Sequence, residues 1–270
     1  MTVDVIEPLA SILALIVGLL FGSFLNVCIY RLPAGRSIVS PGSRCPHCGA
    51  AVRAWQNVPV LSWLALRGRC ASCKAPIAWR YPAVEALTGL TWLALWRQLG
   101  PSWAFGIAVP FAMMMIVLFF TDYDEQLLPD AVTLPGFALG IALAWWNPFL
   151  GDPGWGRLVA AFTGASLGSG ILWGIGALYR RVRGVEGMGF GDVKLMALVG
   201  AFTGAAGVAV TLFVASIVGA AIGLALIPLR GKSLKTELPF GCFLTPAAML
   251  ALLKGRILLA AYLDRIHVGP

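Results

Sequence analysis

The sequence predicts an all-α polytopic membrane protein with about eight transmembrane helices and a small zinc-binding cytoplasmic loop domain. Of the 270 residues, 59% are hydrophobic and only 12% are charged, and the apolar residues form long runs separated by short polar segments. A helix rises about 1.5 Å per residue, so crossing roughly 30 Å of hydrocarbon takes about 20 mainly apolar residues. A basic segment that contains four paired cysteines predicts the loop domain.

The apolar runs give seven or eight expected spans. Five of them are residues 8–30, 83–100, 102–121, 131–150 and 156–179. Residues 195–229 are uncharged and too long for one crossing, so we expect two spans that divide near Gly204 to Gly207. The last run, 240–263, contains Lys254 and Arg256, and such charges are costly inside hydrocarbon unless they are paired or reach the interface.

Pairs of glycines four residues apart recur in these runs. Examples are Gly18/Gly22, Gly164/Gly168 and Gly200/Gly204. Small residues at this spacing let two helix backbones approach closely, so the pairs predict a tightly packed helix bundle rather than isolated anchors.

Basic residues are concentrated in one segment and predict the orientation of the chain. Residues 31–80 contain eight lysines and arginines and no acid, which by the positive-inside rule places them in the cytoplasm and the N-terminus outside. No Lys or Arg precedes the first apolar run, so this run is expected to remain as a helix. The expected organisation is a first transmembrane helix (1–30), a cytoplasmic zinc-binding domain with four cysteines (31–80) and a multi-helix membrane core (81–270). The net charge of +8 then follows from topology, and no nucleic-acid partner is expected.

Two C-x-x-C motifs predict a structural zinc site. Cys45 and Cys48 are separated from Cys70 and Cys73 by 21 residues, a spacing that lets four thiolates close a tetrahedron around zinc. Two disulfides are the alternative, but such bonds rarely persist on the reducing side of the membrane. Four thiolates leave zinc no open position for water, so the predicted role is structural. The other two cysteines, Cys28 and Cys242, lie in apolar runs and are expected to be packing residues.

Acidic residues gather at the predicted cytoplasmic ends of two spans. The stretch FFTDYDEQLLPD contains Asp122, Asp124, Glu125 and Asp130, and GMGFGDVK contains Asp192. Asp122 and Asp124 are about 200° apart on a helix, so only one of them can face Asp192. Two carboxyl groups brought together share a proton, as in aspartic proteases, where one activates water and the other protonates a carbonyl.

The glycines before Asp192 suit the same chemistry. Gly187, Gly189 and Gly191 carry no side chain, which would let a peptide backbone approach the carboxyl group. A tight turn between two spans is the alternative explanation.

Other chemistries fit less well. Gly164-Ala-Ser-Leu-Gly168 matches G-x-S-x-G, but that motif needs a strand-turn-helix context and a histidine partner, and neither of the two histidines lies in a span. HExxH is absent. A proton- or cation-coupled transporter that uses Asp122 and Asp192 is the main alternative, and a membrane scaffold acting through its zinc loop is another.

Five stretches, in order along nearly the whole chain, resemble the signatures of the type 4 prepilin peptidase family. They are GSFLNVCIYRLP (22–33), the paired C-x-x-C motifs, RYPAVEALTG (80–89), TDYDEQLLPD (121–130) and GMGFGDVKLM (187–196). The family consists of inner-membrane GxGD aspartyl proteases that remove the basic leader of type IV prepilins and of the pseudopilins of type II secretion. Its members commonly also methylate the new N-terminal residue with S-adenosylmethionine.

The resemblance implies a role for particular residues. It places the catalytic pair at Asp122 and Asp192, and it implies prepilin or pseudopilin substrates in addition to the surrounding lipid. Asp124, Glu125 and Asp130 would then form an acidic mouth that attracts the basic leader. No motif marks a methyl-donor site; Glu85 is a candidate participant, with helix packing or capping as the alternative. The separation of the two aspartates is longer than expected for relatives, and we assign the extra length to the loop around Asn147 to Gly156.

Overall fold

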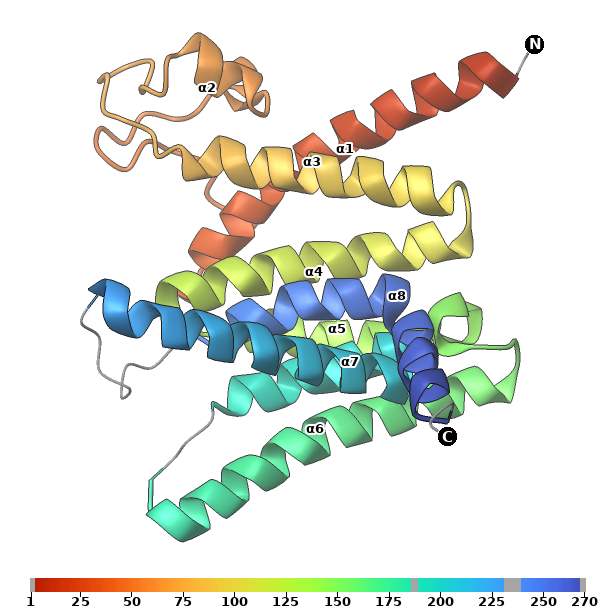
Figure 1. Cartoon of the computed structure of the whole chain (residues 1–270). Coiled ribbons are helices and arrows are strands. Elements are labelled where there is room, and N and C mark those ends of the chain that lie inside the picture. The colour runs from red at the N-terminus through yellow and green to blue at the C-terminus, as the bar shows by residue number, and fades with distance from the viewer. Residues whose placement is uncertain (1–2, 186–188, 231–238, 268–270) are drawn as a thin grey trace. The chain divides into compact units, whose positions relative to one another are not determined.

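The computed structural model describes residues 3–185, 189–230 and 239–267, and within them the regular structure is helical apart from two isolated bridges (Figure 1). The helices, with short 3-10 turns marked η, are α1 (Val3–Arg31), η1 (Ala54–Asn57), α2 (Leu61–Ala65), α3 (Arg80–Leu99), α4 (Trp103–Glu125), α5 (Asp130–Leu143), η2 (Ala144–Trp146), η3 (Pro148–Leu150), α6 (Trp155–Arg183), α7 (Phe190–Arg230) and α8 (Gly241–His267). The predicted all-α class is confirmed.

Five helices of the described chain are long and apolar enough to cross a membrane: α1, α4, α6, α7 and α8. The segment Asp130–Trp146, made of α5 and η2, is apolar but shorter. Helix α3 covers the expected span 83–100 as far as Leu99 but includes Arg80, Glu85 and Arg97. The length-and-hydropathy criterion therefore confirms a multi-spanning membrane protein, whereas the count of eight spans stays a prediction.

The chain divides into two compact units, residues 1–109 and 110–270. In the first unit, α1 packs against α3 through glycines. A Cβ on Gly18 would lie 2.7 Å from the Cβ of Trp92, and a Cβ on Gly22 would lie 2.6 Å from the Cα of Glu85. Only a residue without a side chain allows so close an approach, which confirms the close packing predicted from this glycine pair.

In the second unit, α7 reverses direction at Gly204. This residue has φ 66° and ψ −173°, outside the helical region and accessible chiefly to glycine. Gly168 of α6 lies against both sides of the break, since a Cβ there would be 2.6 Å from the Met196 carbonyl oxygen and 3.3 Å from Val208. The 41-residue helix therefore consists of two segments that double back beside α6, as the length of the run predicted.

The turn at Gly204 is supported by the loop before α6. The side chain of Asn147, fully buried, donates a hydrogen bond of 2.9 Å to the Phe202 carbonyl oxygen. This bond satisfies a carbonyl group in the last turn before the break, where the regular helical partner is lost. Phe202 itself packs on Phe111 of α4, with ring centroids 5.0 Å apart. The segment to which we assigned extra length thus stabilises the reversal of α7.

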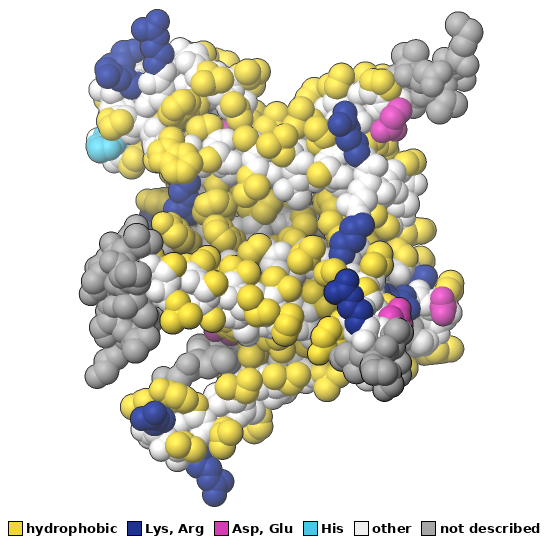
Figure 2. Space-filling model, in the orientation of Figure 1, with side chains coloured by type: hydrophobic (Ala, Val, Ile, Leu, Met, Phe, Trp, Pro, Cys, Tyr) yellow, Lys and Arg dark blue, Asp and Glu magenta, His cyan; other side chains and the backbone are white. Residues whose placement is uncertain are grey.

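Apolar side chains cover most of the visible face in the space-filling view (Figure 2). Large exposed hydrophobic residues occur along the long helices, for example Phe162 of α6 and Phe213 and Ile217 of α7. Lipid tails are as apolar as leucine, so such residues need no burial in protein when the helix lies in a bilayer.

Candidate active site and metal centre

Asp122 lies near the end of α4 with only 5% of its surface exposed. The backbone N–H of Cys242, in the first turn of α8, donates a hydrogen bond of 2.9 Å to Asp122 Oδ2. Asp124, two residues further along the same helix, is exposed. The helical geometry left open which of these two acids points into the protein, and the structure answers that Asp122 does.

Asp192 lies in the first turn of α7 and is half-buried. Leu128 lies beside both aspartates' neighbours, against Gly191 near Asp192 and against Gly241 near Asp122. A Cβ on Gly191 would lie 3.1 Å from the Leu128 Cβ, and a Cβ on Gly241 would lie 3.3 Å from the Leu128 Cδ2. The first turn of α7, which holds Asp192, and the first turn of α8, which donates to Asp122, therefore both contact the same leucine.

Of the two described glycines before Asp192, Gly191 allows close packing, and neither has an unusual backbone conformation. Gly189 and Gly191 have no left-handed φ. Gly191 has Leu128 against the position of a Cβ. Among the described residues, the atoms nearest to a Cβ on Gly189 would be Asp192 Oδ2 at 3.8 Å and the Gly191 nitrogen at 4.0 Å. Gly187, the first glycine of the motif, lies outside the described residues.

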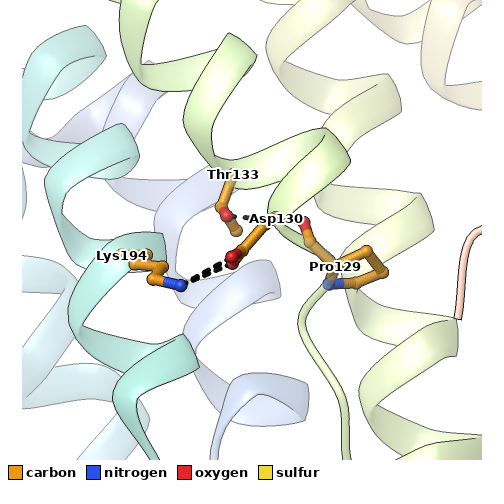
Figure 3. A network of polar contacts seen from close by, with 4 residues as sticks. All are labelled: Pro129, Asp130, Thr133 and Lys194. Atoms are coloured by element: carbon orange, nitrogen blue, oxygen red, sulfur yellow. Dashed lines mark hydrogen bonds and ion pairs between the residues drawn. The ribbon is translucent and has the colours of Figure 1, made fainter. Parts of the chain in front are cut away.

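An ion pair joins the first turn of α5 to α7 beside Asp192 (Figure 3). Lys194 Nζ contacts both carboxylate oxygens of Asp130, at 2.6 and 2.8 Å, and lies 5.1 Å from the ring centroid of Phe190. The negative charge of Asp130 also lies at the helix N-terminus, where it is favourable. Sequence reasoning missed this pair, although a lysine two residues after Asp192 was the available signal.

The four cysteines of the two motifs form one cluster in the first unit. The sulfur atoms of Cys45, Cys48, Cys70 and Cys73 all lie within 4.8 Å of one another. The Cys45 and Cys73 sulfurs are 3.8 Å apart, which is about the edge of a tetrahedron with zinc–sulfur bonds of about 2.3 Å. All four are free thiols, which argues against the alternative of two disulfides.

The two motifs form matching turns. Gly49 N–H donates to the Cys45 carbonyl and Cys45 N–H to the Ala50 carbonyl. Lys74 and Cys70 make the equivalent bonds in the second motif. The backbone N–H groups of Cys73 and Ser72 lower the pKa of the Cys70 thiol to about 6, whereas the pKa of the Cys73 thiol is raised to about 11, so a metal bound here would displace a proton from Cys73. The chemistry and spacing of the cluster can hold a metal such as zinc.

Glu85 of α3 holds the loop between α1 and α3, which contains the four cysteines, against these two helices. Its Oε2 accepts a hydrogen bond of 2.7 Å from the Val60 N–H, and only 9% of the residue is exposed. Val60 has φ 60°, a conformation that a β-branched residue rarely adopts. Asn26 of α1 donates a hydrogen bond of 3.0 Å to the Tyr81 carbonyl oxygen in the first turn of α3, which joins the two helices beside the loop.

Replacing Glu85 with alanine is expected to loosen the loop, because the N–H of the half-buried Val60 loses its partner at a cost of about 1–3 kcal/mol. Limited trypsin digestion at Arg67 and Arg69 measures the effect, and cleavage should be several times faster than in the wild type. Glu85→Gln keeps an acceptor oxygen and should digest at nearly the wild-type rate. Equal digestion of the alanine variant and the wild type would show that Glu85 does not hold the loop.

Comparison with known proteins agrees with these features. The Bacterial Peptidase A24 N-terminal domain matches residues 16–99, and the Type IV leader peptidase family matches residues 109–224. A prepilin leader peptidase/N-methyltransferase from Stutzerimonas stutzeri is 39% identical over 282 residues, which cover 96% of each chain. Proteins of the same name from Pseudomonas putida (39% over 265 residues, 90% of each chain) and Neisseria gonorrhoeae (38% over 253 residues, 85% of this chain and 86% of the relative) are also similar. No solved structure matches significantly.

The fold and the two sites define a multi-pass helical membrane protein with a buried acidic centre and a separate four-cysteine cluster. With relatives of this identity and coverage, the chain belongs to the type IV leader peptidase family. It is an inner-membrane peptidase with methyltransferase activity. The comparisons give no support to the transporter alternative.

Proposed function

We propose that the protein is an intramembrane aspartyl endopeptidase in which Asp122 and Asp192 are the catalytic pair. The observation that carries the proposal is the burial of Asp122 against the first turn of α8, with Leu128 packed against both that turn and the first turn of α7, which holds Asp192. A buried acid in a membrane helix is costly and is functional by default. Asp124, in contrast to Asp122, is exposed.

The proposed hydrolysis uses one proton shared by the two carboxyl groups. The ionised carboxylate takes a proton from water, whose oxygen attacks the peptide carbonyl carbon, while the protonated carboxyl donates its proton to the carbonyl oxygen. As the tetrahedral intermediate collapses and the C–N bond breaks, the first carboxyl gives its proton to the departing amine, and the second carboxylate takes a hydroxyl proton from the intermediate while the carbonyl group re-forms. Each step needs both groups, because neither can be proton donor and acceptor at the same moment.

The proposed substrates are prepilins and pseudopilins with a basic leader, cut at the cytoplasmic face of the membrane. The names of the relatives support the substrate class. The basic segment 31–80 supports the orientation, with the N-terminus outside. We further propose that the four cysteines hold a structural zinc ion, and that S-adenosylmethionine is the methyl donor for the new N-terminus. Glu85 is not proposed for methyl transfer, because its bond to Val60 accounts for its burial.

The proposal is tested by incubating the purified protein in detergent with a type IV prepilin and determining the masses of the products. The expected result is a shortened prepilin that lacks its leader, together with a released basic peptide. An intact prepilin after prolonged incubation with active, folded protein would contradict the proposal.

In the proposed acidic mouth the charge of Asp130 is paired with Lys194. The test is made on Asp124 and Glu125, which are exposed. Changing both to Asn and Gln removes two exposed charges that attract a basic leader. We expect KM to rise by about three- to tenfold with kcat nearly unchanged, and the salt dependence of KM to flatten. Steady-state cleavage assays at several salt concentrations measure this.

Asp152→Asn provides a matched control, because Asp152 is an exposed acid in the loop before α6, away from the pair. Its KM should equal that of the wild type. An unchanged KM in the Asp124/Glu125 variant would show that these two acids do not attract the leader.

A further inference from the structure

The N-terminal end of α8 lies directly against the carboxyl group of Asp122. The Cys242 N–H donates to Oδ2 at 2.9 Å, and a Cβ added to Gly241 would lie 2.7 Å from the same oxygen. The approach is therefore between a carboxylate and bare helix backbone. Cys242 is 120 residues from Asp122 along the chain.

We propose that the first turn of α8 positions Asp122 for catalysis, and that Gly241 is a positioning residue whose missing side chain makes the contact possible. This inference rests on the proposed catalytic role of Asp122. The amide of Cys242 fixes one carboxylate oxygen and thereby the direction in which the other can act. The unpaired N–H groups and the partial positive charge at a helix N-terminus both favour a carboxylate there.

Space, rather than backbone conformation, explains why position 241 is glycine. Gly241 has no left-handed φ, so its conformation is open to any residue. A methyl group at this position would lie too close to Asp122 Oδ2 and Cγ, at 2.7 and 2.9 Å, and one of the two groups would have to move. The backbone of Asp122 is held in α4 and that of Gly241 in α8, whereas the Asp122 side chain can rotate; the carboxyl group is therefore expected to shift and to lose its bond to Cys242.

Leu128 adds a second constraint on the same contact. Its side chain lies against both Gly241 and Gly191, and so any displacement at the start of α8 also reaches the start of α7, next to Asp192. The positioning of the two acids is therefore coupled through one side chain. A shift of about 1 Å at a reacting group is enough to cost about a hundredfold in rate.

Gly255 provides a matched control in the same helix. A Cβ there would lie 3.4 Å from the Gly207 Cα and 3.7 Å from the Ala251 Cβ, which are ordinary contact distances. Gly→Ala adds one methyl group to α8 at either position; Gly255 lies in the helix interior, where the change also raises helix propensity, whereas Gly241 is the first residue of the helix. The new methyl group would clash with the Asp122 carboxyl group at position 241, whereas at position 255 it would make only ordinary contacts.

The first test measures prepilin cleavage by Gly241→Ala. We expect kcat to fall about a hundredfold with KM within about threefold of the wild type, whereas Gly255→Ala should retain kcat within about threefold. Wild-type kcat in Gly241→Ala, alongside an inactive Asp122→Asn, would overturn the positioning role and leave the catalytic pair intact. Full cleavage by Asp122→Asn would instead overturn the proposed function.

The second test does not depend on activity. Thermal unfolding in detergent is compared for Gly241→Ala in the wild type and in an Asp122→Ala background, where the carboxyl group is absent. We expect a fall in Tm of about 3 °C or more in the wild type and no fall in the Asp122→Ala background. The same fall in both backgrounds would mean that Gly241 does not make room for Asp122, and would overturn the inference.

Discussion

Asp122→Asn and Asp192→Asn are each expected to lower kcat for prepilin cleavage by about a thousandfold or more. Asparagine has nearly the shape of aspartate, but its amide can neither take a proton from water nor give one to a carbonyl oxygen. Binding of the prepilin should persist, because neither substitution removes apolar surface. Single-turnover cleavage with excess enzyme and a binding assay with the uncut prepilin separate the two effects.

Asp124→Asn is the matched control for this prediction. It removes an acid two residues from Asp122, on the exposed side of α4. Its kcat should stay within about threefold of the wild type. A thousandfold loss in Asp124→Asn, with full activity in Asp122→Asn, would mean that Asp124 and not Asp122 is the catalytic acid.

Replacing Cys70 with serine is expected to remove zinc from the protein and to unfold the loop between α1 and α3. Four thiolates bind zinc with an apparent free energy of about 10–16 kcal/mol at neutral pH, and much of this is folding free energy when the site is structural. Little else in the loop can stabilise its fold without a metal, since its helices η1 and α2 are only four and five residues long and contain no buried residue. Metal analysis of purified protein should fall from about one zinc per chain to nearly none.

Cys28→Ala is the control for the metal prediction. Cys28 is buried in α1 and is not part of the cluster, so this variant should keep its zinc. Trypsin digestion of the loop should accelerate in Cys70→Ser and not in Cys28→Ala. A full zinc content in Cys70→Ser would exclude the cluster as the metal site.

The features predicted best from sequence are those with local signals. The spacing of the two C-x-x-C motifs predicts that their sulfur atoms lie close together. The Cys45 and Cys73 sulfurs are indeed 3.8 Å apart. The uncharged run 195–229 is too long for one crossing, which located the reversal at Gly204 within a few residues. Composition and span length alone were sufficient for the fold class.

The features that were missed depend on contacts between distant segments. Helical periodicity separates Asp122 from Asp124 but does not say which faces protein, because that depends on α8. Asp130 was placed in the acidic mouth on charge alone, since Lys194 is 64 residues away in sequence. Gly241 resembles any other glycine of an apolar run until the carboxyl group beside it is known.

The central claim is that Asp122 and Asp192 act as one unit on a peptide bond. Its most direct measurement is single-turnover prepilin cleavage, followed by mass spectrometry, for the two single Asp→Asn variants and the double variant. If the acids share one mechanism, the double variant will be no slower than the slower single variant, because either loss already stops the reaction. Rate losses that multiply in the double variant, or a leader released at the wild-type rate by either single variant, would contradict the account.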